Sequence, residues 1–147
     1  MNKKKFCYEY PRPSVTVDIV LVTREDKPRV LLIQRKHDPF AGAWAMPGGF
    51  VDMDETLEAS ARRELKEETG LEVGKLEQLH TFGDPGRDPR GRTISVVFLG
   101  QVNEARLKPV AADDAASVGW HRLDRLPPLA FDHDKILACA RVRLKDS

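Results

Sequence analysis

The sequence GFVDMDETLEASARRELKEETGL, residues 49–71, carries the strongest structural signal in the chain. It begins directly after a Pro-Gly pair, which favours a turn, whereas residues 56–69 contain strong helix formers and neither Gly nor Pro. Thr56 is suited to the N-cap of a helix, and Gly70 to a left-handed C-terminal cap. The stretch therefore predicts a loop that leads into a helix bounded by these two residues.

Two stripes of side chains run along the predicted helix. One stripe is apolar and can pack on a sheet; its members are Leu57, Ala61 and Leu65. The other is acidic: Glu64, Glu67 and Glu68 are three or four residues apart, so their carboxylates project from neighbouring turns. Like charges at this spacing destabilise an isolated helix by roughly 0.2–0.5 kcal/mol per pair, so the repulsion must be offset.

Two explanations for the acidic stripe follow from residue chemistry. Arg63 and Lys66 lie close enough to form ion pairs, as in an ordinary solvated helix rich in charge pairs. Alternatively, carboxylate oxygens with room for water suit Mg²⁺ or Mn²⁺, and Mg²⁺ commonly bridges protein carboxylates to substrate phosphates. Gly48 and Gly49, just before the helix, would let the backbone come close to a bound ion or phosphate.

The spacing of the fixed residues separates the two explanations. The stretch fits the pattern G-x5-E-x7-R-E-U-x-E-E-x-G-U, where U is a bulky aliphatic residue, at every fixed position. At roughly 6% usage per residue type, chance agreement at its non-aliphatic positions is expected about once in 10⁸ windows. The pattern is the Nudix box, and the chain resembles the Nudix hydrolases. The matching residues are Gly49, Glu55, Arg63, Glu64, Leu65, Glu67, Glu68, Gly70 and Leu71.

The resemblance implies one Nudix hydrolase domain across residues 1–147, with residues 1–12 as an N-terminal tail or edge segment and residues 49–71 as the box. The implied fold class is α/β (α+β): the Nudix fold, an α/β/α sandwich with a curved mixed β-sheet. It also implies that Glu55 supports the metal site and that Arg63 orients the box carboxylates by charge-assisted hydrogen bonds. The expected ligands of Mg²⁺, or of Mn²⁺, are the Gly48 carbonyl and the carboxylates of Glu64, Glu67 and Glu68.

The rest of the chain supplies strands for the sheet. Residues 15–23, VTVDIVLVT, are an almost continuous β-branched and apolar run, which indicates a strand buried on both faces. Residues 29–35 form the returning strand, and Trp44 is expected to pack under the loop that follows it. Further elements are a weak strand at 71–79, strands at 94–102 and 118–123, and a helix capped by Asp132 that runs to about residue 145.

Residues 81–93, TFGDPGRDPRGRT, read as a surface loop full of turn residues, yet the loop is anchored by a strand and carries three arginines. Arginine suits bidentate contact with phosphate. The segment FGDPGRDPRGRTISVVFL resembles the equivalent segment of ADP-ribose pyrophosphatases, although similar segments recur in Nudix-derived transcription regulators that sense NAD metabolites. The expected substrate-binding residues are Gly49, Arg35, Arg87, Arg90 and Arg92.

Two acids outside the box are candidates for the chemistry. Asp113 and Asp114 lie on a loop of small residues, and in many Nudix proteins such an acid positions the attacking water or completes the metal site. Nothing local distinguishes the two from ordinary turn residues. The expected catalytic residues are therefore Glu64, Glu67, Glu68, Arg63, Asp113 and Asp114, whereas each of the four histidines is expected to pack or cap.

Composition limits the partners. Charged residues make up 32% of the chain but leave a net charge of +1, so no strong field favours nucleic acid or an anionic membrane. No apolar run approaches the roughly 18 residues of a membrane span. Cys7 and Cys139 show neither ligand nor disulfide spacing, which suits a reducing cytoplasm. The resemblance implies a homodimer that acts on a small nucleotide diphosphate.

The leading functional hypothesis is Mg²⁺-dependent hydrolysis of ADP-ribose to AMP and ribose 5-phosphate. A house-cleaning nucleoside triphosphate pyrophosphohydrolase would share every box residue. A third hypothesis, from a different class, is a non-catalytic sensor that binds ADP-ribose and regulates a partner. The intact box acids favour an enzyme over the sensor.

Overall fold

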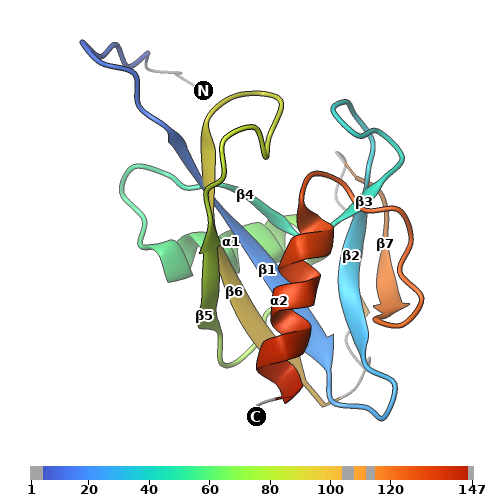
Figure 1. The fold of residues 1–147 in the computed structure, drawn as a ribbon. Helices are drawn as coiled ribbons and strands as arrows, with labels where there is room; N and C mark the ends of the chain where they lie inside the picture. Colours follow the sequence, from blue (N-terminus) through green and yellow to red (C-terminus); the bar gives the residue numbers. More distant parts are fainter. Residues whose placement is uncertain (1–4, 104–107, 112–114, 146–147) are drawn as a thin grey trace.

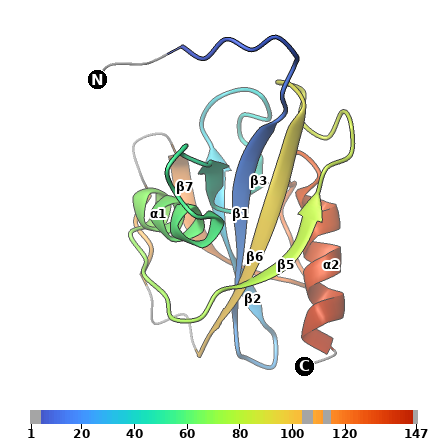
Figure 2. The same cartoon turned by 90° about the vertical axis from the view of Figure 1, so that its left-hand side faces the viewer.

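The computed structural model describes residues 5–103, 108–111 and 115–145 of the 147-residue chain. Within that part, the strands are β1 (Ser14–Thr23), β2 (Arg29–Arg35), β3 (Trp44–Ala45), β4 (Gly48–Phe50), β5 (Glu77–Phe82), β6 (Thr93–Val102) and β7 (Ala115–Arg122). The helices are α1 (Leu57–Thr69) and α2 (His133–Lys145). Figure 1 and Figure 2 show a twisted sheet with α1 on one face and α2 on the other, which confirms the predicted α/β/α sandwich.

The sheet is mixed and is organised around β1. This strand pairs in parallel with β6 over ten consecutive residue pairs. On its other edge, β1 pairs with β4 at residues 16–18 and with β2 only at Val22, near its end. The sheet therefore divides between β4 and β2, beside the middle of β1. The outer strands complete the sheet, with β5 on β6, and β3 and β7 on β2.

The core consists of two apolar clusters, one on each face of the sheet. Alternate residues of β1 feed both clusters, because successive side chains of a strand point to opposite faces. Ile19 packs in the cluster under α1, and Val20 in the cluster under α2. Both side chains are fully buried, so the prediction of a strand covered on both faces is confirmed.

The helix predicted from the box forms with the expected ends. The Thr56 hydroxyl accepts a hydrogen bond from the Ala59 N–H at 3.1 Å, and Gly70 adopts the left-handed conformation with φ 75°. Ala61 and Leu65 are buried against the sheet, whereas Leu57 is 37% exposed. The apolar stripe therefore covers the middle of α1 only, and the prediction that Leu57 belongs to it was wrong.

Several element boundaries differ from the prediction. Residues 71–76 are not in a strand, and β5 begins at Glu77, because Leu71 and Leu76 pack as loop residues in the cluster under α1. Trp44 lies in the two-residue strand β3, and its packing role is confirmed by contact with the α2 cluster and with the His121 ring. Asp132 precedes α2, but its carboxylate binds Arg87, so the predicted side-chain cap is replaced by an ion pair.

Residues 5–13 form neither helix nor strand and are exposed. Neither α1 nor α2 is long and apolar enough to cross a membrane.

Candidate functional site

The acidic face of α1 lies against β4. The backbone N–H of Gly48 donates to the Glu68 carboxylate at 3.1 Å. A Cβ atom at Gly49 would lie 2.5 Å from the carboxylate carbon of Glu64, a distance that real Cβ atoms do not adopt. A larger residue at Gly49 would force the end of the Glu64 side chain to move, so Gly48 and Gly49 bring the β4 backbone directly onto two of the acids.

Arg63 connects the carboxylates of the box. Its guanidinium makes a two-point contact with Glu55, at 2.7 and 2.9 Å, and also donates to Glu64 at 2.9 Å and to Glu67 at 3.2 Å. A further bond, to the Phe50 carbonyl at 3.2 Å, ties the same group to β4. The charge-assisted hydrogen bond from Arg63 lowers the pKa of Glu55. The structure thus contains the ion pairs predicted for Arg63.

The other box charges are arranged differently. Lys66 pairs with Glu72, beyond the helix, at 3.1 Å. The Glu64 side chain is 13% exposed, and burial raises its pKa even though Arg63 acts in the opposite direction. Glu67 is 60% exposed and meets solvent. Glu64 is thus a carboxylate whose charge is only partly compensated by the protein.

Whether the acidic face of α1 suits a divalent ion depends on its carboxylate oxygens. Among the residues that the structure describes, no three His, Cys, Asp or Glu side chains converge closely enough to hold a metal ion, since Arg63 engages Glu64 and Glu67, and Gly48 engages Glu68. Glu64 and Glu68 are nevertheless one helical turn apart, so side-chain rotation brings their carboxylates together. Hard carboxylate oxygens are the donors that Mg²⁺ and Mn²⁺ prefer, and the charge of Glu64 is only partly compensated by the protein.

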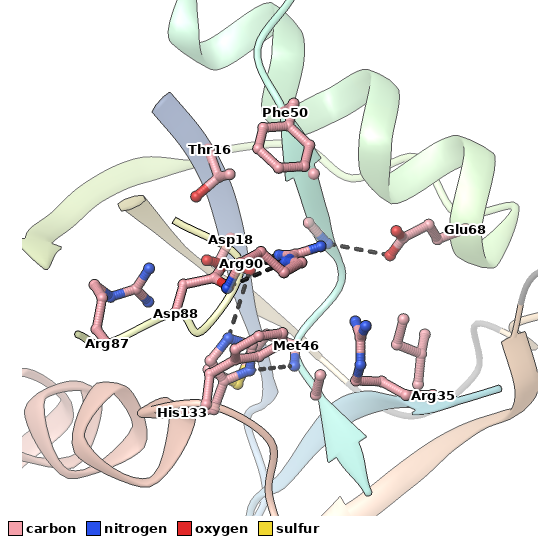
Figure 3. Close-up of a pocket in the computed structure, with 15 residues that line it drawn as sticks. Thr16, Asp18, Arg35, Met46, Phe50, Glu68, Arg87, Asp88, Arg90 and His133 are labelled. Carbon is pink, nitrogen blue, oxygen red and sulfur yellow. Dashed lines mark hydrogen bonds and ion pairs between the residues drawn. The ribbon is translucent and has the colours of Figure 1, made fainter. Parts of the chain in front are cut away.

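A continuous cleft runs from this face into the division between β4 and β2. Its open part, about 470 Å³, lies over the box and is lined by Glu64, Arg63 and Lys36, among others. Its deep part, about 100 Å³, is lined by Asp18, Asp88 and His133. Both parts share the following lining residues: Ile33, Arg35, Gly48, Gly49, Phe50, Glu68 and Arg90. Figure 3 shows the deep part, with Glu68 on one side and His133 on the other.

Two of the predicted arginines stand where the two parts of the cleft meet. Arg35 donates to the Pro39 carbonyl at 2.7 Å and lies 4.9 Å from the Phe131 ring centroid. Burial lowers the pKa of Arg35, and the nearby Arg90 adds to the effect. Arg90 is held by Asp88, whose carboxylate is almost fully buried, and it lies between the Phe50 and Phe131 rings at 5.4 and 5.2 Å. Both guanidiniums are therefore fixed in place and face the cleft.

The remaining predicted residues are placed less directly. Arg87 lines the deep part, but its guanidinium is 5% exposed and bonded to Asp132 at 2.7 and 2.9 Å. Arg92 donates to the Gly83 carbonyl and lines neither part of the cleft. Asp113 and Asp114 lie outside the residues that the structure describes.

Three polar residues that the sequence did not single out meet at the floor of the deep part. Asp18 Oδ2 accepts a hydrogen bond from the Ser95 hydroxyl, across the parallel pair of β1 and β6. His133 Nδ1 accepts from the Met46 N–H at 3.1 Å, so a neutral imidazole carries its proton on Nε2, which is 3.8 Å from Asp18 Oδ1. Burial lowers the pKa of His133, which favours this neutral form. The sequence signal that could have indicated this group is Asp18, a single acid within the apolar run of residues 15–23.

Comparison with known proteins agrees with the box. The NUDIX domain family model matches residues 12–139. The chain is 46% identical over 128 residues to an ADP-ribose pyrophosphatase of Methanocaldococcus jannaschii, covering 87% of this chain and 73% of that protein. It is 36% identical over 144 residues to an ADPR responsive transcriptional repressor of Acinetobacter baylyi, covering 94% of this chain but only 57% of the repressor.

A solved structure extends the likeness to three dimensions. The NUDIX domain of Shewanella oneidensis NrtR, crystallised with ADP ribose, superposes with a TM-score of 0.85 at 37% identity, over 92% of this chain and 90% of that one. A family match over most of the chain, an intact box and a shared fold all agree. The chain therefore belongs to the NUDIX domain family, and it is a Nudix hydrolase.

Proposed function

We propose that this protein hydrolyses the pyrophosphate bond of ADP-ribose to AMP and ribose 5-phosphate, with Mg²⁺ as its metal and Mn²⁺ as an alternative. The observation that carries the proposal is the continuity of the cleft, which runs from the box carboxylates past two fixed guanidiniums to a polar floor. An elongated substrate with a diphosphate at its centre matches this sequence of charges. The ADP-ribose pyrophosphatase relative and the ADP-ribose complex of a similar domain support the choice of substrate.

The metal would be held by the Gly48 carbonyl and by carboxylates of α1. The proposed ligands on the helix are Glu64, Glu67 and Glu68. When bound, a divalent ion at these oxygens neutralises the diphosphate and lowers the pKa of a coordinated water. Arg63 already contacts Glu64 and Glu67 and fixes Glu55, so it would keep the carboxylates aligned beside β4.

The protein's own side chains would bind the diphosphate and manage the proton. The anionic oxygens of the diphosphate repel a nucleophile, so cationic groups must bind these oxygens. Arg35 and Arg90 are in position for this, since each is anchored by a protein acceptor and faces the cleft. Glu67, whose side chain is 60% exposed, is the proposed acceptor of the proton from the attacking water, with Asp113 or Asp114 as the alternative.

A substrate panel tests the proposal. Purified protein is incubated with Mg²⁺ or Mn²⁺ and either ADP-ribose or a nucleoside triphosphate, and the release of AMP, pyrophosphate and ribose 5-phosphate is measured. The expected result is the highest kcat/KM for ADP-ribose, with AMP as a product. A higher kcat/KM for triphosphates would replace this proposal with the house-cleaning function. In the same assay Glu68→Gln should abolish turnover, whereas the matched control Glu58→Gln, at an exposed acid of the same helix that pairs with Arg62, should retain it.

The similarity to a transcriptional repressor supports one further candidate, an ADP-ribose sensor. In the same panel, a sensor would bind ADP-ribose in calorimetry without hydrolysing it. The intact carboxylates of α1 favour hydrolysis.

We also propose a homodimer acting on a small nucleotide in the cytoplasm. Both cysteines are free in the structure, which suits a reducing compartment. The near-zero net charge supports a small-molecule partner over nucleic acid. Light scattering on the purified protein measures the assembly, and a monomer at micromolar concentration would contradict the dimer.

A further inference from the structure

We propose that Asp18 and His133 form a subsite for a hydroxyl group of the terminal ribose of the substrate, at the floor of the deep part of the cleft. This inference rests on the proposed function, because it assigns one half of ADP-ribose to a defined place. Asp18 would be the residue that selects a sugar with free hydroxyls over a substrate end that lacks them.

The spacing of two polar atoms is the first observation. Asp18 Oδ1 and His133 Nε2 are 3.8 Å apart, which is too long for a hydrogen bond between them. Their other polar atoms are already engaged, Oδ2 by the Ser95 hydroxyl and Nδ1 by the Met46 N–H. One oxygen about 2.8 Å from each atom would bridge the gap with good hydrogen-bond lengths.

The chemistry of that bridge selects a hydroxyl. With Nδ1 accepting from Met46, Nε2 is a donor, whereas Asp18 Oδ1 is an acceptor. The bridging atom must therefore accept one hydrogen bond and donate another. A hydroxyl does both with a single oxygen, whereas an amino group on an aromatic base only donates. Both residues are buried, with side chains that are 12% exposed for Asp18 and 5% exposed for His133, so the pair forms part of the cavity wall.

The size and walls of the deep part favour the smaller half of the substrate. Its volume is about 100 Å³, well below the roughly 300 Å³ at which pockets begin to enclose whole small ligands. This volume favours a single sugar ring over a purine with its ribose. Phe131, a ring in this part that could stack on a base, already has the guanidiniums of Arg35 and Arg90 over it.

The subsite also lies at the right place along the substrate. A Cβ atom on Gly48 would lie 2.3 Å from Asp18 Oδ1, and the N–H of the same Gly48 donates to Glu68. A single residue therefore separates the subsite from the box carboxylates. Each ribose of ADP-ribose is one phosphate away from the bond that is cleaved, so this short separation suits a sugar ring. The small volume of the deep part then favours the terminal ribose, which carries no base.

The test compares two substrates in a set of variants. The substrates are ADP-ribose and an analogue whose terminal sugar lacks the 2- and 3-hydroxyls. For the wild type, removal of the hydroxyls should lower kcat/KM by about 10- to 100-fold, as expected for a hydrogen bond to a charged group. Asp18→Asn should lower kcat/KM for ADP-ribose by a similar factor and should change it little for the analogue. A loss by the same factor on both substrates would show a structural role and overturn the inference.

Two controls complete the design. Asp124→Asn makes the same change at an exposed carboxylate that pairs with Arg122, just after β7. Asp124 lines neither part of the cleft, so this variant should leave both rates unchanged. If Asp18→Asn does not fold, His133→Asn serves instead. Its amide oxygen can replace Nδ1 as the acceptor for Met46 but supplies no group at Nε2, so the same selective loss is expected.

Binding measurements test the subsite separately from the proposed hydrolysis. If the wild type hydrolyses neither substrate, the proposed function fails, and calorimetric titration of both compounds then tests the subsite. A tighter Kd for ADP-ribose than for the analogue, lost in Asp18→Asn, would support it. Equal affinities, or no binding of either compound, would overturn it.

Discussion

At the scale of single residues, the site depends on arginine geometry more than on charge alone. Arg63 reaches Glu55, Glu64 and Glu67 at once because a planar guanidinium presents donors in several directions. A lysine ammonium at the same position is a compact point charge and cannot keep a two-point contact with Glu55. The alignment of the box acids therefore requires this particular side chain.

Replacing Arg63 by Lys tests that requirement. We expect kcat to fall by about 10- to 100-fold, the usual cost of disturbing groups that orient metal ligands, with a higher Mg²⁺ concentration needed for half-maximal rate. Steady-state kinetics over a Mg²⁺ titration provides the measurement. Arg62→Lys is the matched control, because Arg62 bonds Glu58 and two carbonyls away from the cleft. Equal losses in both variants would contradict the orienting role.

His133 makes the stability of the protein depend on pH. Burial lowers its pKa below the ordinary 6.5, so at pH below 6.5 the unfolded chain binds a proton that the folded protein does not. The free energy of unfolding should therefore decrease as the pH falls from 7 to about 5.5. His133→Asn should show a shallower decrease over that range, measured as Tm by circular dichroism. Parallel Tm curves for the two proteins would exclude the histidine as the cause.

At the scale of elements, α1 was predictable because its signals are local. The cap residues, the helix formers and the box acids all lie within one stretch, and the structure places the ends of the helix where Thr56 and Gly70 predicted them. The short strands β3 and β4 were not predictable, since two or three residues show no periodicity and depend on partners elsewhere in the chain. The beginning of β5 was missed because Leu71 and Leu76 are buried by tertiary packing without being in a strand.

The residues at the floor of the cleft could not be predicted from the sequence either, because tertiary packing brings them together. Asp18 contacts Ser95, 77 residues further along the chain, because β1 and β6 pair in parallel. His133, the first residue of α2, lies on the other side of Asp18. The spacing of residues along the sequence does not indicate contacts between segments this far apart. The sequence did point to the box acids, Arg35 and Arg90, which line the cleft, since a motif or the chemistry of arginine indicates them.

The two glycines of β4 should respond differently to substitution. An added Cβ at Gly48 would lie 2.3 Å from the Val17 backbone carbonyl, which cannot move without disturbing the β1–β4 pair. At Gly49, the nearest atoms belong to the end of the Glu64 side chain, which can rotate away. We expect Gly48→Ala to destabilise the protein by about 1–3 kcal/mol, and Gly49→Ala to fold normally with a large loss of kcat. Urea unfolding and kinetics measure the two effects, and similar stabilities would contradict this distinction.

At the scale of the whole molecule, metal binding and folding should be coupled through Glu64. Burial raises the pKa of Glu64, so the folded state disfavours its charge, and this penalty is greatest above the folded pKa and disappears as the carboxyl is protonated. Without metal at pH 7, Glu64→Gln should therefore raise Tm, by about 2–4 °C for each kcal/mol gained. The same variant should lose turnover.

Addition of Mg²⁺ should reverse the order of the two proteins. An ion that binds only the folded state adds about 2.7 kcal/mol at a hundred times its Kd, and Glu64→Gln should gain much less. Calorimetric scans with EDTA and with Mg²⁺ measure both effects. Glu58→Gln is the control, as an exposed acid of the same helix that should respond to Mg²⁺ as the wild type does. A wild type whose Tm ignores Mg²⁺ would contradict the proposed metal site.

The parallel pairing of β1 with β6 has a consequence for how the protein is made. As the ribosome releases the chain, β1 emerges early as a nearly continuous apolar segment, but its ten-residue partner is complete only at Val102. Strands joined over such a distance form slowly, because a long loop must close before any pairing is gained. Nascent chains shorter than this point therefore expose an unpaired apolar edge, which makes them candidates for chaperone capture during translation.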